Sequence, residues 1–130
     1  KRPTMKKAQP SGRYVDGFVI PIAKRKLPRY RRIAAMAGKI WMDLGALEYR
    51  ECVGDDLDIK MVTPFPRIAK AKKGETVVFS WIVYRNRAHR DRVNALVMKD
   101  PRVAKMMTEA PVFDPKRMAY GGFRVLVDAK

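Results

Sequence analysis

Cysteine and histidine are almost absent from this sequence. It contains one cysteine, Cys52, and one histidine, His89. A single cysteine excludes a disulfide within the chain and a cysteine-based zinc site, and a single histidine cannot build a histidine-rich metal centre. We therefore expect no metal and no cofactor, and a cytoplasmic location is the default.

Long apolar runs are missing as well. No stretch approaches the roughly 18 apolar residues that a membrane span needs, and no signal-peptide pattern is present, so no membrane association is expected. With 130 residues, of which 47% are hydrophobic, the chain is long enough for one domain with a single core. The sequence also lacks a nucleophile elbow, a phosphate-binding glycine loop and a cluster of metal ligands.

Acidic residues are few. Thirteen Asp and Glu stand against 29 Lys and Arg, which gives a formal net charge of +16. Residues 1–39 hold twelve of the cations and a single acid, Asp16. Residues 1–13 are polar, basic and without periodicity, which predicts a disordered basic arm, either native or left from cloning, ahead of a single domain over 14–130. The basic N-terminal region, residues 1–39, could bind nucleic acid or another anionic surface.

Hydrophobic periodicity predicts the main elements. Alternation indicates strands over residues 14–22, 46–53, 76–84 and 118–127, the last with a bulge at Gly121 and Gly122. Apolar residues at helical spacing predict one helix from Pro28 to the stop signal at Gly45, and a second over residues 87–99. The connection over residues 54–74 is long, and connections of this length often cover binding sites.

The order strand, helix, strand, strand, helix, strand is that of the ferredoxin-like βαββαβ fold. In this α+β arrangement, two helices pack on one face of a four-stranded antiparallel sheet. Strands 14–22 and 76–84 are apolar on both faces, so the face without helices would expose a large apolar surface. A second copy would cover that surface, and we predict a homodimer whose two sheets face each other as a dimeric α/β barrel.

Several segments together resemble a known family. YVDGFVIPI, GALEYRECVGDD, TPFPR, GETVVFSWIVYRNRAHRDRVNALVMKDPR and KRMAYGGFRVLVD, between Tyr14 and Asp128, are similar to the YbaA-like family of uncharacterised bacterial proteins. The resemblance implies the dimeric α/β-barrel superfamily, which includes small monooxygenases, dismutase-like haem proteins and degradative enzymes. It supplies no catalytic residues, and the basic charge of this chain departs from the mostly acidic to neutral members of the family.

Candidate catalytic residues are Asp16, Glu48 and His89. Asp16 and Glu48 lie on predicted strands among apolar neighbours, so each is either paired with a cation such as Arg50 or has a raised pKa that suits proton transfer. His89 is flanked by several arginines, whose charges should keep it neutral. It is either a general base at the mouth of a site or a surface or capping histidine near the start of its helix.

Trp41, Arg50, Trp81 and Tyr120 are candidate ligand-binding residues, although aromatic residues at these spacings also build cores. The site that they would line lies between the helical layer and the sheet, or under residues 54–74. We therefore expect a dimer that binds or transforms a small organic molecule. The alternatives are a nucleic-acid or anionic-surface binder and a non-catalytic scaffold. The sequence leaves the substrate open, and also whether the protein is an enzyme.

Overall fold

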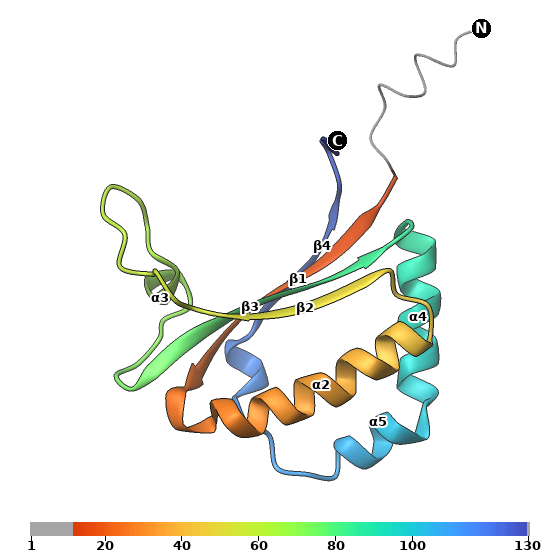
Figure 1. The fold of residues 1–130 in the computed structure, drawn as a ribbon, viewed down its shortest axis with the longest axis horizontal. Coiled ribbons are helices and arrows are strands. Elements are labelled where there is room, and N and C mark those ends of the chain that lie inside the picture. Colours follow the sequence, from red (N-terminus) through yellow and green to blue (C-terminus); the bar gives the residue numbers. More distant parts are fainter. Residues whose placement is uncertain (1–11, 130) are drawn as a thin grey trace, which may run out of the picture.

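A four-stranded antiparallel sheet forms the centre of the computed structural model, which describes residues 12–129 (Figure 1). Its strands are β1 (Tyr14–Ala23), β2 (Glu48–Val53), β3 (Glu75–Tyr84) and β4 (Ala119–Arg124). They lie in the order β2-β3-β1-β4, so β2 and β4 form the two edges. The basic arm expected over residues 1–13 lies, apart from residues 12 and 13, outside the described residues.

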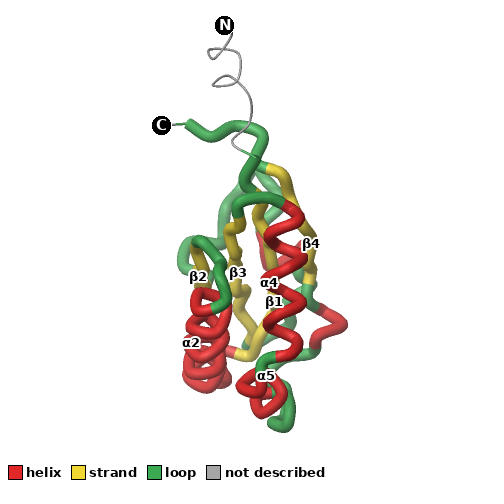
Figure 2. Tube along the Cα trace, turned by 90° about the vertical axis from the view of Figure 1, so that its right-hand side faces the viewer, coloured by secondary structure: helices red, strands yellow, loops and turns green. Residues whose placement is uncertain are grey.

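The two long helices lie on the same face of this sheet (Figures 1 and 2). α2 (Leu27–Asp43) follows β1 after the short turn η1 (Lys24–Lys26), and α4 (Arg87–Lys99) follows β3. Three shorter elements complete the chain: α3 (Phe65–Ile68), α5 (Pro101–Met106) and η2 (Pro115–Arg117). Both long helices agree with the sequence prediction to within a residue or two. Across residues 12–129, no helix combines the length and the apolar character needed to cross a membrane.

The core lies between the helices and the sheet. Alternate side chains of β1 and β3 are buried there, because a strand turns successive side chains to opposite faces. The buried strand residues on this face are Tyr14, Asp16, Ile20, Ile22, Thr76, Val78, Ser80, Ile82 and Tyr84. They pack on apolar helix residues such as Tyr30, Ile40, Val93 and Val97. Each buried aliphatic side chain of this kind contributes roughly 1.5 to 3 kcal/mol to stability.

The opposite face of the sheet carries exposed aromatic side chains. Phe79 is 43% exposed and Phe123 is 61% exposed. The connection over residues 54–74 is not a plain loop, because it contains the single helical turn α3. The Phe65 ring of α3 lies 5.8 Å from the Phe79 ring, between centroids, and covers part of this face.

The prediction of a bulge at Gly121 and Gly122 is wrong, and the last strand, predicted over residues 118–127, spans only Ala119–Arg124. The pairing of β1 with β4 runs without interruption from Tyr14 opposite Arg124 to Val19 opposite Ala119. The glycines serve close packing instead. A Cβ atom on Gly122 would collide with the Tyr14 side chain, so the absence of a side chain lets the Tyr14 ring lie over β4.

Candidate functional site

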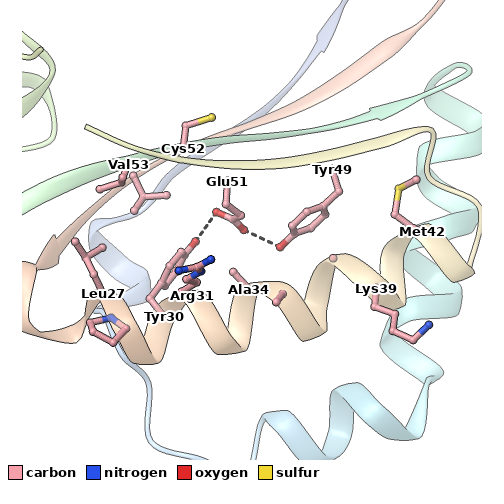
Figure 3. A pocket seen from close by; sticks show the side chains of 14 residues that line it. Leu27, Tyr30, Arg31, Ala34, Lys39, Met42, Tyr49, Glu51, Cys52 and Val53 are labelled. Carbon is pink, nitrogen blue, oxygen red and sulfur yellow. Dashed lines mark hydrogen bonds between the residues drawn. The ribbon is translucent and has the colours of Figure 1, made fainter. Parts of the chain in front are cut away.

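An open groove of about 930 Å³ runs between α2 and the edge strand β2 (Figure 3). Its α2 wall is mostly small or apolar and includes Ala34, Ala35, Gly38 and Met42. Arg31 and Lys39 lie on the same helix and add positive charge to the lining. The groove exists because β2 has a neighbouring strand on only one side, so the space beside α2 is open to solvent.

The Glu51 carboxylate lies at the polar centre of this groove. Tyr30, from α2, donates its hydroxyl to Oε1 of Glu51 at 2.7 Å, and Tyr49 donates to Oε2 at 2.7 Å. Tyr49 and Glu51 are two residues apart on β2, so both side chains point toward α2, as Figure 3 shows. Within residues 12–129, Glu51 has no salt-bridge partner. Among the described residues, two neutral hydroxyl groups hold this carboxylate and no cation forms a salt bridge with it.

The two tyrosines keep their protons and act as hydrogen-bond donors in this arrangement. Burial raises the pKa of the Tyr30 phenol above its ordinary value, and the negative charge of Glu51 raises it further. The same two causes, in the same order, raise the pKa of Tyr49. Both phenols therefore remain protonated at neutral pH and donate to Glu51. Because a carboxylate has about four lone-pair positions, Glu51 can still accept hydrogen bonds from a ligand.

Gly38 makes this geometry possible. A Cβ atom at this position would lie 2.9 Å from Cδ1 of the Tyr49 ring, which is closer than a carbon contact allows. The ring therefore packs directly on the backbone of α2. A smaller cavity of about 190 Å³ lies behind the groove and shares Tyr30, Tyr49 and Glu51 with it. Glu51 therefore lines both cavities.

Asp16 belongs to a second polar group, between α4 and the sheet. Only 1% of Asp16 is exposed, and its Oδ1 accepts a hydrogen bond from Nη1 of Arg90 at 2.7 Å. The same Nη1 contacts the Tyr120 hydroxyl at 2.9 Å, and the Arg90 guanidinium lies 5.0 Å from the centre of the Tyr14 ring. Burial raises the pKa of Asp16, and Arg90 opposes that shift. The aspartate is thus both an ion-pair member and a perturbed carboxyl group.

Trp41, on α2, lies between the helices and the sheet, as Asp16 does. Its Nε1 donates to Oδ1 of Asn94 at 3.2 Å, and the Tyr84 hydroxyl donates to that oxygen at 3.2 Å. The Trp41 ring also lies 6.2 Å from the Tyr49 ring, between centroids. Trp41 therefore links α2 to α4 and packs behind the Tyr49 ring.

Glu48, Arg50 and Trp81 occupy strand positions that alternate with those facing α2. Arg50 and Trp81 nevertheless line the smaller cavity of about 190 Å³, together with Trp41. Nε1 of Trp81 donates to Oε2 of Glu48 at 2.6 Å, so these two candidates are in contact. Arg50 lies opposite Trp81 in the pairing of β2 with β3. Its Nη1 donates to the Tyr49 carbonyl oxygen at 3.1 Å, and it forms no salt bridge with Glu48 or Asp16 in the described part of the chain.

His89 is only 4% exposed and lies in the first turn of α4. Its Nδ1 accepts a hydrogen bond from the Arg85 backbone N–H at 2.9 Å, and its own backbone N–H donates to the Asn86 side chain at 2.8 Å. Burial lowers its pKa, and the charges of Arg85 and Arg92 lower it further. His89 is therefore a neutral, buried histidine at the point where β3 turns into α4.

The three candidate catalytic residues do not converge. Asp16 meets Tyr120 through Arg90, Glu48 meets Trp81, and His89 lies apart from both pairs. No group of three or more metal-ligating side chains occurs in the part of the chain that the structure describes. Sequence reasoning overlooked Glu51, although the alternation predicted over residues 46–53 puts Tyr49 and Glu51 on one face of the strand. It had no signal for Tyr30, whose contact with Glu51 spans a helix and a strand.

Comparison with known proteins gives consistent matches. The model of a family described as "Protein of unknown function (DUF1428)" matches residues 13–115. The chain is 43% identical over 116 residues to the uncharacterized protein YbaA of Escherichia coli (strain K12), an alignment that covers 89% of this chain and 98% of that protein. The protein of the same name from Shigella flexneri matches with the same identity and coverage.

Proposed function

The chain belongs to the DUF1428 family of proteins of unknown function, and we propose that it binds a small amphipathic organic molecule in the groove between α2 and β2. One observation carries the proposal. A single carboxylate, Glu51, lies in a largely apolar groove and is held from two sides by Tyr30 and Tyr49. Binding sites for small molecules typically combine an apolar lining with a few fixed polar groups.

The chemistry of Glu51 defines the ligand. Its partners are neutral hydroxyls, so its negative charge is not balanced by a salt bridge in the described residues. A ligand with an ammonium or hydroxyl group at one end would donate to the remaining lone pairs of Glu51. Its apolar body would then lie along Ala34, Ala35 and Met42 on α2. Since the tyrosines stay protonated, they position Glu51 and do not act as bases.

Three probes with the same apolar chain test this proposal: octylamine, octanol and octanoate. We expect octylamine to bind most tightly in calorimetry at about 0.15 M salt, where the long-range repulsion from the basic protein is screened within about 8 Å. Glu51→Gln replaces an accepting oxygen with a donating amide nitrogen, and it should weaken octylamine about tenfold or more, the loss of one charge-assisted hydrogen bond. Equal binding of octanoate, unaffected by Glu51→Gln, would reject the assignment.

Two tryptophan variants, one inside the groove and one outside it, test whether octylamine binds in the groove. Ala35 lines the groove, whereas its neighbour Met36 is 46% exposed on α2 outside it. Ala35→Trp should therefore abolish octylamine binding, and Met36→Trp should leave it unchanged. If both variants bind octylamine like the wild type, the groove is not the site.

We also propose that the protein is a homodimer with the ferredoxin-like, dimeric α/β-barrel architecture. The element order and the strand order β2-β3-β1-β4 support this architecture. The aromatic face that the helices leave open supports a second copy as its cover. Binding of nucleic acid or an anionic surface by residues 1–39 and a cytoplasmic location remain predictions from the sequence.

A further inference from the structure

A second hollow, of about 570 Å³, lies where the end of β1, the turn before β3 and the segment before β4 meet. It shares no lining residue with the groove beside Glu51. Five basic side chains line it: Arg25, Lys26, Lys72, Lys73 and Arg117. We propose that this hollow binds the phosphate group of a small phosphorylated molecule, a function separate from that of the groove.

The walls of the hollow are held together by the fold. The Lys24 backbone N–H donates to the Gly74 carbonyl oxygen at 3.0 Å, which joins η1 to the turn before β3. Arg117, at the end of η2, donates to both Glu75 oxygens at 2.8 and 2.7 Å, and to the Lys70 carbonyl oxygen at 3.0 Å. These bonds link all three segments, so a ligand would meet preformed walls and would not have to order them.

Both carboxylates in the lining are already engaged. Glu75 binds Arg117 and accepts from the Lys72 backbone N–H at 2.7 Å. The hydrogen bonds from Arg117 are the main cause that lowers the pKa of Glu75 to about 2, and the bond from the Lys72 backbone is the next. Asp114 accepts from the Lys116 backbone N–H at 3.0 Å and caps η2. The two acids therefore stabilise the walls.

Four of the five cations differ from Arg117, which forms a salt bridge with Glu75, although the nearby charge of Lys72 helps to lower the pKa of Glu75. Among residues 12–129, none of Arg25, Lys26, Lys72 and Lys73 forms a salt bridge. Including Arg117, the lining holds five cations and two carboxylates, which leaves three positive charges in excess. Most surface lysines are simply solvated. Here, however, cations from two segments almost 50 residues apart in sequence line one hollow.

Phosphate fits this arrangement better than a monovalent carboxylate. A phosphate group carries close to two negative charges at neutral pH and has three strong acceptor oxygens. Lysine ammonium groups bind it as point charges, and an arginine adds a planar pair of donors. The volume lies within the range of roughly 300 to 1,000 Å³ that small-molecule sites occupy. The hollow therefore matches a compact phosphorylated compound in both charge and size.

Pyrophosphate is the probe for this site, and titration calorimetry at low salt is the measurement. Lys72→Ala/Lys73→Ala should weaken binding about tenfold or more, since it removes two charges that act directly on the ligand. Lys99→Ala/Lys105→Ala removes the same charge from residues outside the hollow and should change the affinity less than about twofold. Lys72→Arg/Lys73→Arg should restore binding. Circular dichroism of each variant confirms that the fold is retained.

A single-stranded oligonucleotide separates this proposal from nucleic-acid binding. We expect the oligonucleotide to bind no more tightly than pyrophosphate and to be displaced by it. The proposal is overturned if pyrophosphate does not bind at low salt, or if the two alanine double variants lose affinity equally. It is also overturned if the oligonucleotide binds tightly and pyrophosphate does not compete, because the basic charge would then serve an extended polyanion.

Discussion

Two carboxylates on the helical side of the sheet, Asp16 and Glu51, differ in the partners that hold them. Asp16 is paired with the Arg90 guanidinium, which offsets part of the cost of burying its charge. Glu51 is matched by two hydroxyls and retains its own charge. A carboxylate that is already engaged in a buried ion pair offers little to a ligand. A carboxylate that lies in an open groove and has no salt-bridge partner among the described residues can bind a cationic or donating group.

Gly38 is the residue on which the Glu51 arrangement depends most directly. In an unobstructed helix interior, a change from glycine to alanine stabilises by up to about 1 kcal/mol. At this position the added methyl group would press on the Tyr49 ring, so we expect Gly38→Ala to destabilise the protein by about 1 to 3 kcal/mol in urea unfolding. In a Tyr49→Leu background the obstruction is gone, and the same change should become neutral or stabilising. A stabilising effect in the wild-type background would contradict the packing described.

At the scale of the elements, the helices could be predicted from sequence because their signals are local. α4 begins after Asn86, whose side chain accepts the His89 backbone N–H, and ends at Asp100, ahead of Pro101. α2 ends before Gly45, which adopts a φ of 118°. Such signals lie within a few residues of the boundary that they define, so one segment of sequence contains all the information.

β4 and the groove could not be predicted in the same way, because their causes are contacts between distant residues. The glycine pair in β4 was interpreted as a bulge, whereas the Tyr14 ring explains Gly122 and the Phe123 ring lies beside Gly121. Tyr30 and Glu51 are 21 residues apart, on different elements, and nothing in either local sequence indicates their hydrogen bond. The sequence therefore predicted where the helices lie and left the candidate site undetermined.

His89 gives the junction between β3 and α4 a defined pH dependence. Its folded pKa is lowered from the ordinary 6.5, first by burial and then by Arg85 and Arg92. Because the unfolded chain binds the proton more readily, the contribution of His89 to stability is complete above pH 6.5 and is lost as the pH falls below it. Urea unfolding between pH 7.5 and pH 5 should show wild-type stability falling more steeply than that of His89→Gln, whose side chain does not titrate. Parallel curves for the two proteins would show that His89 contributes nothing.

At the scale of the whole molecule, the sheet has one covered face and one open face. Gly17 and Gly121 lie opposite each other in the pairing of β1 with β4. A Cβ on Gly17 would lie 3.4 Å from the Phe123 ring, so these two positions leave a flat surface on which the ring rests. Phe123 and Phe79 both remain largely exposed to solvent there. Exposed aromatic side chains that are grouped on one face are typical of association surfaces.

We expect the protein to sediment as a dimer at micromolar concentration, with the two open faces in contact. Phe123→Glu places one buried charge from each subunit into a two-fold interface, and it should weaken the dimer about 100-fold or more, as loss of a central aromatic side chain commonly does. Leu96→Glu is the matched control, because Leu96 is 51% exposed on α4, on the helical side, and we expect it to leave the dimer intact. If the wild type sediments as a monomer, or if Leu96→Glu dissociates it equally, the open face is not the dimer interface. Because the groove beside Glu51 lies on the helical side, Phe123→Glu should still bind octylamine, which separates assembly from ligand binding.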